Sequence, residues 1–320
     1  MDDSSEAGTT ASPAVGRVVR LFRYPLKGMT PEALPEVPLH PGDSVPGDRM
    51  FALARPDTMF DEEDPEVLPK TRFVMLQKDE ALARIRSSFD PASGMLTFGL
   101  CEQAAHTGDV PGNGPGDVPG NGPGDGPGGG PAARPGDGLV DVRRVDLNTP
   151  AGRAELEDYV LAVLGSRLGG RPRLVAARGR HRFTDTGAGG DTFMHAISVI
   201  NLASVRDLAE RVGEPVDPLR FRANVYIDGI APWAELGWAG MELGLGAARA
   251  RVLARTPRCA ATTVNPETGI RDIRILKELS SNYGHTDCGV YVTMLTEAIL
   301  RPGDPLTPPD GREEDVLCGS

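Results

Sequence analysis

The sequence predicts a β-rich α+β protein. Short apolar segments with turn residues between them occur in both halves of the chain and are typical of strands. Two longer segments carry the capping signals of helices. Of the 320 residues, 39% are hydrophobic and 25% are charged, which is the normal balance of a globular protein with a sizeable core.

The first half of the chain contains several predicted strands. Ordered structure is expected to begin at "GRVVRLFRYPLKG", where residues 18–22 predict a strand that runs into a turn at Pro25. Further short strands are predicted at "MFALARP" from Met50, "RFVMLQ" from Arg72, "ALARIRS" from Ala81 and "MLTFGL" from Met95. Short strands separated by turns favour a barrel-like or sandwich-like half.

A low-complexity insert interrupts this half. "GDVPGNGPGDVPGNGPGDGPGGGP" at residues 108–131 has almost no apolar side chains and therefore cannot bury a core. Strand-like sequence resumes at "LVDVRRVDL", so residues 104–138 are expected to form a disordered loop within the first half. Its closure entropy rises by only about 0.6 kcal/mol per doubling of length. Residues 1–14 and 309–320 are expected to be disordered tails.

The clearest helix is predicted in "TPAGRAELEDYVLAVLG". Thr149 is a suitable N-cap, Pro150 suits the first helical position, and Gly165 supplies a stop. A second helix is predicted in "SVRDLAERVG", opened by Ser204 with Asp207 in capping-box register. The other segments of this half predict strands: "RPRLVAA", "AISVIN", "ANVYIDG" and "ARARVLAR". Strands therefore dominate, with helices on the flanks.

The net charge of −11 argues against nucleic acid as a partner, because binding to a phosphate backbone relies on excess Lys and Arg. Six arginines between Arg167 and Arg182 reverse this balance locally. Such a segment in an acidic protein suggests a specific small anion. The same arginines could also line a substrate entrance, contact an acidic redox partner or face solvent.

The four cysteines show no CxxC spacing, so neither a disulfide framework nor a zinc site is expected. Cys101 and Cys288 are expected to pack in the interior, and Cys318 lies in the C-terminal tail. The acidic, polar N-terminus resembles neither a secretory signal nor a transit peptide, and no apolar run approaches the roughly 18 residues of a membrane span. A cytoplasmic protein with reduced thiols and no membrane partner is expected.

Cys259 lies in the segment "RTPRCAATTVNPETG". It follows a predicted strand and precedes the turn residues of "NPETG", so it is expected at a strand end or in a loop. The neighbouring Arg258 favours a thiolate over a thiol, and the thiolate is the form that binds a metal or attacks an electrophile. From this dipeptide alone, a packed and inert cysteine remains the alternative.

A second candidate site is "RFRANVYI". Alternation along a strand places Arg220, Arg222 and Asn224 on one face, where two guanidiniums and a carboxamide suit a phosphate. An exposed strand face with salt bridges is the alternative. Lys27 in "YPLKG" and Arg49 in "GDRMF" add one cation each, beside a turn and at a strand start.

Taken together, these segments resemble the MOSC family, the molybdenum cofactor sulfurase C-terminal domain, preceded by its N-terminal β-barrel companion. The motifs occur in the order typical of the family over roughly residues 16–305: "YPLKG", "DRMF", "RGRHRFTD", "LRFRANVYI", "RCAATTVNPETG", "CGVYVTM" and "RPGDP". Within the family, the chain looks most like the mitochondrial amidoxime-reducing component and its bacterial relatives. The resemblance implies a β-barrel-like domain at 15–170 packed on a MOSC β-barrel domain at 171–308, with flanking helices.

The resemblance also implies a molybdenum cofactor site. The cysteine of the Arg-Cys motif, here Cys259, would be the protein ligand of molybdenum, and Lys27 and Arg49 would contact the cofactor. Arg222 and Asn224 would hold the pterin phosphate. The remaining implied residues are Pro257 and Arg258, in the loop that presents the ligand, and Tyr291 in the last strand. This fits the chemistry, because dithiolene-bound molybdenum is soft and suits a thiolate, while the pterin tail carries a phosphate.

The chain departs from the family pattern at three positions. Gly28 stands where the amidoxime reducers carry Ser, so one side-chain hydrogen bond is missing or moved. Met194 and His195 stand where they carry a Thr-Ser pair before "AISVIN". His195 is a candidate substitute donor, with a loop histidine as the alternative. In "NYGHTDCGVY", His285 is a candidate catalytic residue that relays protons near the predicted site, with a structural turn role as the alternative.

The implied activity is an oxidoreductase that reduces N-hydroxylated compounds, such as amidoximes, hydroxylamines and N-oxides, by two electrons. The alternatives are a sulfur carrier that forms a persulfide on Cys259, and a molybdopterin carrier module. The chain has no room for a pyridoxal-phosphate desulfurase domain, so any sulfur would arrive from a separate protein. Only Cys318 follows Arg301, so electrons are expected from a separate ferredoxin, flavoprotein or cytochrome.

Overall fold

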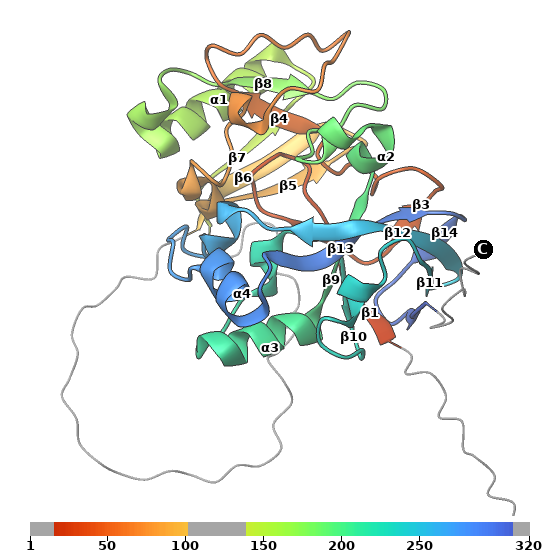
Figure 1. The fold of residues 1–320 in the computed structure, drawn as a ribbon. Coiled ribbons are helices and arrows are strands. Elements are labelled where there is room, and N and C mark those ends of the chain that lie inside the picture. Colours follow the sequence, from red (N-terminus) through yellow and green to blue (C-terminus); the bar gives the residue numbers. More distant parts are fainter. Residues whose placement is uncertain (1–15, 102–138, 310–320) are drawn as a thin grey trace, which may run out of the picture.

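The computed structural model describes residues 16–101 and 139–309, and a closed seven-stranded barrel dominates its second half (Figure 1). The order around the barrel is β10–β9–β13–β12–β11–β15–β1, and pairing of β1 with β10 closes the ring. The strands are β1 (Gly16–Arg23), β9 (Ile197–Asn201), β10 (Val225–Asp228), β11 (Glu242–Leu245), β12 (Ala248–Pro257), β13 (Asp287–Met294) and β15 (Pro305–Thr307). The predicted β-rich α+β class is confirmed.

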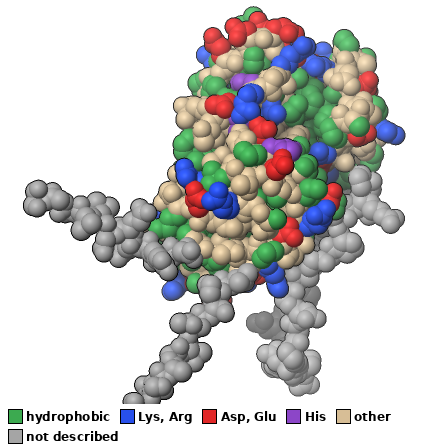
Figure 2. Space-filling model, turned by 90° about the vertical axis from the view of Figure 1, so that its right-hand side faces the viewer, with side chains coloured by type: hydrophobic (Ala, Val, Ile, Leu, Met, Phe, Trp, Pro, Cys, Tyr) green, Lys and Arg blue, Asp and Glu red, His purple; other side chains and the backbone are tan. Residues whose placement is uncertain are grey.

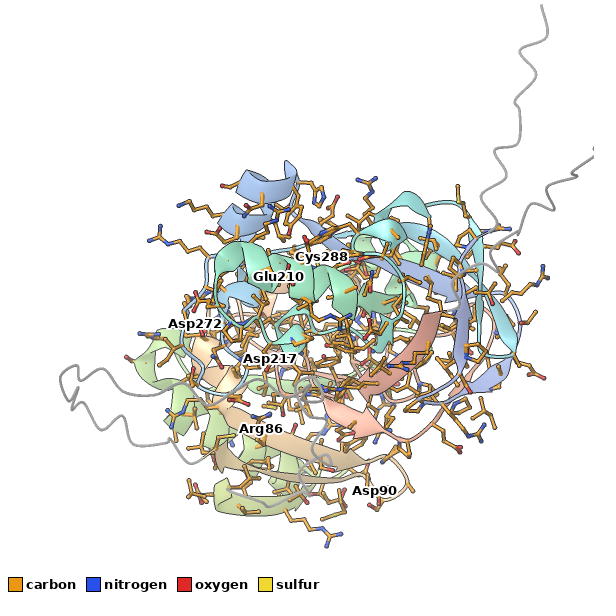
Figure 3. All side chains as sticks on the ribbon, turned by 90° about the horizontal axis from the view of Figure 1, so that it is seen from below. Arg86, Asp90, Glu210, Asp217, Asp272 and Cys288 are labelled. Atoms are coloured by element: carbon orange, nitrogen blue, oxygen red, sulfur yellow. The ribbon has the colours of Figure 1, made fainter. Side chains whose placement is uncertain are left out.

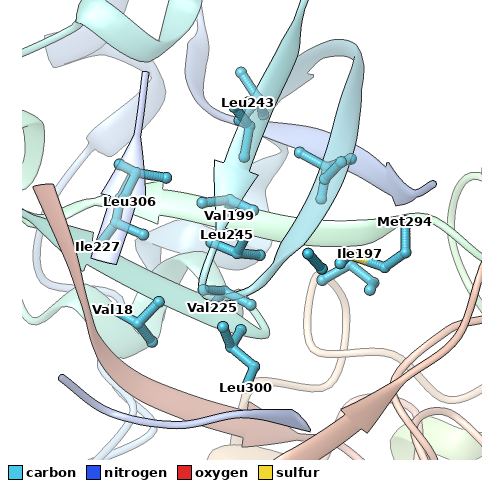
Figure 4. Close-up of a cluster of buried hydrophobic side chains, with 14 of the residues drawn as sticks. Val18, Ile197, Val199, Val225, Ile227, Leu243, Leu245, Met294, Leu300 and Leu306 are labelled. Atoms are coloured by element: carbon cyan, nitrogen blue, oxygen red, sulfur yellow. The ribbon is translucent and has the colours of Figure 1, made fainter. Parts of the chain in front are cut away.

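The barrel is filled by the inward-pointing side chains of its strands (Figure 4). Along β12, for example, Ala248, Ala250 and Val252 are buried while Arg249 and Arg251 are exposed. This alternation follows from the two-residue period of a strand, and closure of the sheet removes the unpaired edges that an open sheet would present. The barrel interior is therefore a packed core.

A second set of sheets lies above the barrel in the view of Figure 1. β4 (Phe51–Ala54) pairs with β8 (Arg173–Ala176), and β5 (Ile85–Asp90), β6 (Met95–Cys101) and β7 (Leu139–Asp146) form a three-stranded sheet. Helix α1 (Pro150–Leu164) packs on the latter, with the rings of Phe98 and Tyr159 4.8 Å apart. In the described part of the chain, these two sheets have two and three strands.

The remaining helices are short, and two of them cover one side of the barrel, at the bottom of Figure 1. These are α3 (Leu202–Val212) and α4 (Ile275–Tyr283), which bury Cys288 beneath them (Figure 3). The other elements are α2 (Asp191–Met194), the strands β2 (Glu32–Leu34), β3 (Val37–Leu39) and β14 (Ala298–Leu300), and the 3-10 helices η1 (Lys70–Arg72), η2 (Glu80–Arg84), η3 (Gly165–Leu168), η4 (Gly187–Gly189), η5 (Pro218–Phe221), η6 (Ala234–Gly237) and η7 (Ala260–Thr263).

Most predicted elements are present, and the differences have local causes. Thr149 caps α1 as predicted, because its hydroxyl accepts a hydrogen bond from the Gly152 amide at 3.1 Å. Helix α3 begins earlier than predicted, with Asn201 as its N-cap, because the hydroxyl of Ser204 donates to the buried Glu235 instead. The strand predicted from Arg72 is a turn with a single bridge from Phe73 to Ala54. The strand predicted from Ala81 begins as η2 and becomes β5.

The sheets cross the boundary predicted between residues 170 and 171. β1 and β2, from the expected first domain, belong to the barrel sheet, and β3 pairs with β14. β8, from the expected second domain, pairs with β4. The predicted insert at 104–138, the N-terminal tail and, beyond Pro309, the C-terminal tail lie outside the described residues. Within those residues, no helix has both the length and the apolar character needed to span a membrane.

Candidate functional site

A cavity of about 730 Å³ is lined by residues from both halves of the molecule. The structure brings nine of the predicted site residues to its wall: Lys27, Gly28, Arg49, Arg222, Asn224, Pro257, Arg258, Cys259 and Tyr291. The volume is within the usual range for a small-molecule or cofactor site. We therefore take this cavity as the candidate functional site.

Cys259 lies at the end of β12, where the chain turns into η7. Its carbonyl oxygen accepts hydrogen bonds from the amide (3.1 Å) and the hydroxyl (3.0 Å) of Thr262, which fixes the turn. Cys259 is half-buried and lines the cavity, whereas Cys288 is fully buried and burial raises the pKa of its thiol to about 12. Of these two thiols, only Cys259 is placed to meet a ligand in the cavity.

Arg258 holds the loop that carries Cys259. Its Nε donates to the Cys288 carbonyl at 2.7 Å, and its Nη1 donates to the Phe221 carbonyl at 2.9 Å. The guanidinium also lies 5.3 Å from the centre of the Phe221 ring. Gly289, with φ +78°, lies beside this guanidinium. A Cβ there would lie 3.2 Å from Nη2 of Arg258 and 2.3 Å from the Val199 carbonyl oxygen on β9. The arginine predicted to favour a thiolate thus bonds to main-chain carbonyls.

Arg222 and Arg49 lie around one aromatic ring. Arg222 has φ +53° and follows η5, so the prediction that residues 220–224 alternate along a strand is wrong. Its Nη1 donates to the Met29 carbonyl at 2.6 Å, and its guanidinium lies 4.4 Å from the centre of the Tyr24 ring. Arg49 lies 5.2 Å from the same centre and pairs with Asp48. Burial lowers the pKa of Arg222, so an anion there would restore a favourable environment for its charge.

Asn224 is buried, and its side chain bonds mainly to residues of β9 and β1. Its Oδ1 accepts from the amide (3.2 Å) and the hydroxyl (2.9 Å) of Ser198, and its Nδ2 donates to the Phe22 carbonyl at 3.2 Å. A carboxamide nitrogen carries two hydrogens, so one donor is left for a ligand. Asn224 therefore holds β1 against β9 and can add one hydrogen bond to the site.

Two residues of the cavity were missed by the sequence reasoning. Asp185 accepts from Lys27 through Oδ1 and from Lys70 through Oδ2, the latter at 3.4 Å. Burial would raise the pKa of Asp185, but Lys27 and then Lys70 outweigh it and lower the pKa to about 2. Burial lowers the pKa of Lys70, but Asp185 and Cys259 outweigh that effect and raise it. Lys70 and Cys259 line the same cavity. Of these residues, only Asp185 lies in a motif noted from the sequence, "RGRHRFTD".

Tyr291, Arg220 and Arg255 also lie in the cavity wall. Tyr291 lies on β13, half-buried. Arg220 is buried and forms a 2.7 Å salt bridge with Asp272, in the loop before α4 (Figure 3). Arg255 donates from Nε to the Leu236 carbonyl at 2.7 Å.

Gly28 has φ +85°, and a Cβ there would lie 3.0 Å from Leu82. The backbone at this position therefore favours glycine, in keeping with the expectation that a side-chain hydrogen bond is missing or moved here.

The two histidines predicted for the site do not line the cavity. His195 is buried, with its Nε2 3.4 Å from Asp191, and burial lowers its pKa. His285 accepts from the Asp287 amide at 3.2 Å and lies in an aromatic cluster, with its ring centre 6.1 Å from those of Tyr283 and Trp233. The roles of phosphate donor for His195 and proton relay for His285 are therefore not supported by their positions.

The arginine-rich segment also lies apart from the cavity, since none of its six arginines is part of the cavity wall. Arg167, Arg178 and Arg180 form salt bridges with acidic side chains, at 3.0, 2.9 and 2.7 Å. The face shown in Figure 2 likewise has basic and acidic side chains interspersed. Of the alternatives left open for this segment, a paired surface agrees best with these contacts.

Comparison with known proteins identifies the family of the second half. Residues 178–307 match the family model described as "MOSC domain". This part of the chain is a MOSC domain. It contains the strands β9 to β15, and only β1 of the barrel lies outside it. It also contains Cys259, Arg258 and Arg222. The family predicted from the motifs is confirmed.

Curated relatives match about a third of the chain. It is 32% identical over 120 residues to mitochondrial amidoxime-reducing component 1 of Mus musculus, and 28% identical over 122 residues to component 2 of Bos taurus. These matches cover 34% of the chain and 35% and 36% of those relatives, respectively. The chain is also 36% identical over 102 residues to the molybdenum cofactor sulfurase of Drosophila willistoni, covering 31% of the chain and 12% of that protein.

Two solved structures are also similar to this chain. YiiM from Geobacillus stearothermophilus aligns with a TM-score of 0.28 at 20% identity, covering 36% of this chain and 54% of YiiM. The YUAD protein from Bacillus subtilis aligns with a TM-score of 0.36 at 11% identity, covering 92% of this chain and 96% of YUAD.

Proposed function

We propose that the cavity binds a molybdenum cofactor through Cys259 and that the protein reduces N-hydroxylated compounds. The observation that carries this proposal is the position of Cys259, a half-buried thiol that shares one cavity with the guanidiniums of Arg222 and Arg258. The names of the curated relatives, amidoxime-reducing components and a molybdenum cofactor sulfurase, support molybdenum-related chemistry.

The residues of the cavity fit such a cofactor. Seven cations line it, namely Lys27, Arg49, Lys70, Arg220, Arg222, Arg255 and Arg258, against one carboxylate, Asp185. Within the described part of the chain, Arg222, Arg255 and Arg258 have no carboxylate within salt-bridge distance and bond to main-chain carbonyls. An anion is the complement of such a surplus, and a thiolate is the protein ligand that a soft metal prefers.

Each residue then has a defined task. Cys259 would hold the metal, and Arg222, with the remaining amide hydrogen of Asn224, would bind the phosphate of the pterin. Arg258 positions the cysteine loop by its bonds to the Cys288 and Phe221 carbonyls. Lys27 and Arg49 would contact the cofactor from the N-terminal side of the cavity.

When bound, the cofactor supplies the two-electron oxygen chemistry that no side chain offers. The net reaction takes R–NHOH, two electrons and two protons to R–NH2 and water. The N–O bond breaks, the substrate nitrogen is reduced, and the oxygen leaves as water. We propose that the electrons come from a separate donor protein of the ferredoxin, flavoprotein or cytochrome type.

A sulfur-transfer function is the second candidate. It is favoured by the half-buried position of Cys259 in the cavity wall and by the relative named molybdenum cofactor sulfurase. The Cys259 thiolate would attack the outer sulfur of a persulfide on a separate donor protein, and the thiolate of the donor would leave. In that case Cys259 would deliver sulfur to an acceptor in the cavity.

The test is the substitution Cys259→Ser in protein purified from a host that makes the cofactor. We expect near-stoichiometric molybdenum and pterin in the wild type, and a loss of bound metal and of benzamidoxime reduction by about 100-fold or more in the variant. Cys101→Ser is the matched control, since Cys101 is a half-buried thiol outside the cavity. Full reductase activity in Cys259→Ser would dismiss the proposal. A mass increment of one sulfur on Cys259 without molybdenum would favour sulfur transfer.

A further inference from the structure

The cationic side chains of the cavity differ in their hydrogen-bond and salt-bridge partners within the protein. Arg49 pairs with Asp48, and Arg220 pairs with Asp272 at 2.7 Å. Arg222, Arg255 and Arg258 are held in place by main-chain carbonyls, as described above. These five guanidiniums are therefore fixed to the fold.

The two lysines share a single carboxylate. Lys27 is the inner lysine, with 9% of its side chain exposed, and it bonds to both Asp185 and the Phe183 carbonyl, the latter at 3.1 Å. Lys70 is the outer lysine, with 34% of its side chain exposed, and it lies 3.4 Å from Asp185. Two ammonium groups and one carboxylate leave this trio with a net positive charge. Lys70, with the longer contact and the larger exposure, is the lysine that can offer this charge to a ligand.

Lys70 also lies where a substrate would meet the reacting centre. It lines the same cavity as Cys259. The wall of this cavity also includes the buried Met75 and Leu76 and the half-buried Phe193. An apolar surface in the same cavity as a partly exposed lysine suits a ligand with a hydrophobic body and an anionic group.

We propose that Lys70 is a specificity-determining residue of this cavity and that it selects N-hydroxylated compounds that carry a carboxylate over their neutral counterparts. The inference rests on the proposed function for the reaction, but the binding preference depends only on residues of this chain. Lys70 would donate a charge-assisted hydrogen bond to the carboxylate of the substrate, and its role is electrostatic rather than one of proton transfer.

The test compares two compounds of the same shape. 4-Carboxybenzamidoxime is anionic at neutral pH, and 4-carbamoylbenzamidoxime is its neutral isostere. In the wild-type holoenzyme we expect a KM about ten-fold lower for the carboxylate, the effect of one charge-assisted hydrogen bond, with similar kcat values. Lys70→Met should remove this preference, and Lys70→Arg should restore most of it. The control Lys78→Met, at an exposed lysine outside the cavity, should leave it unchanged.

Titration calorimetry of the same compounds without a reductant measures binding apart from turnover. A carboxylate preference that is present in the wild type and lost in Lys70→Met supports the inference, even if neither compound is reduced, in which case the proposed reaction alone fails. Equal affinities of the wild type for both compounds overturn the inference while leaving the reductase proposal intact. A preference that survives in a folded Lys70→Met variant also overturns it, and the thermal unfolding temperature establishes that the variant is folded.

Discussion

The cavity has an arginine side, Arg222 and Arg258, and a lysine side, Lys27 and Lys70 with Asp185, and the two sides hold their charges differently. The arginines donate to main-chain carbonyls, at 2.6 Å to Met29 and 2.7 Å to Cys288. The lysines share one side-chain carboxylate, which is itself about half exposed. Main-chain acceptors are fixed by the folded backbone, whereas a carboxylate on an exposed side chain can move.

This difference suggests that the two sides bind different kinds of ligand. A cation fixed to the barrel backbone suits a group that stays bound, because its geometry is set before the ligand arrives. A lysine at the edge of the cavity has a flexible stem and suits a ligand that comes and goes. The arginine side should therefore contribute strongly to the stability of the fold, and the lysine side should contribute little.

The largest expected effect is at Arg258. In Arg258→Met, the carbonyls of Cys288 and Phe221 lose their charged donor, and we expect the free energy of unfolding to fall by about 4 kcal/mol. Urea unfolding of the purified variant measures this loss. Lys70→Met is the matched variant on the lysine side and should remain within about 0.5 kcal/mol of the wild type. Equal losses at Arg258 and Lys70 would contradict the comparison.

The next effect tests the close approach of β13 to β9 at Gly289, beside Arg258. Gly289→Ala would place a Cβ 2.3 Å from the Val199 carbonyl at φ +78°, so we expect a loss of about 3 kcal/mol from strain and overlap. Gly284→Ala is the control, because Gly284 has φ +73° with no atom within 4 Å of its Cβ position, and it should cost only about 1 kcal/mol. A cost no larger at Gly289 than at Gly284 would show that the close approach to β9 is unimportant.

The elements that the sequence predicted well are those specified by neighbouring residues. Helix α1 has its cap at Thr149, its Pro150 and its stop at Gly165 within one segment, and the structure follows them. The left-handed conformation of Arg222 could not be predicted in this way. Its guanidinium is placed by Tyr24 and by the Met29 carbonyl, which is 193 residues away along the chain.

The sequence predicted the site residues that lie in motifs, and it missed those that are brought to the site by contacts between distant parts of the chain. Cys259 and Arg49 came from motifs and line the cavity. Lys70 was missed because its contact with Asp185 joins residues 115 positions apart, and nothing near Lys70 in the sequence signals a ligand. His195 was misplaced because its position in a motif does not show which way its ring points, and the ring lies against Asp191.

The smallest expected effect is at Asp185, where the lysine side can be tested through pH. The carboxylate has a pKa of about 2 in the folded protein, below its ordinary 3.8, because Lys27 and Lys70 outweigh the effect of burial. A lowered pKa stabilises the fold above about pH 4, and this stability is lost as the pH falls from about 4 towards 2. In Asp185→Asn, the carboxamide oxygen can still accept from Lys27, so we expect the free energy of unfolding to fall by about 1 kcal/mol or less at pH 7.

The difference in the free energy of unfolding between wild type and variant should vanish near pH 2, as measured by urea unfolding at several pH values. A difference that stays constant down to pH 2 would mean that the two lysines do not act through the charge of Asp185, and the distinction between the two sides of the cavity would lose its electrostatic basis.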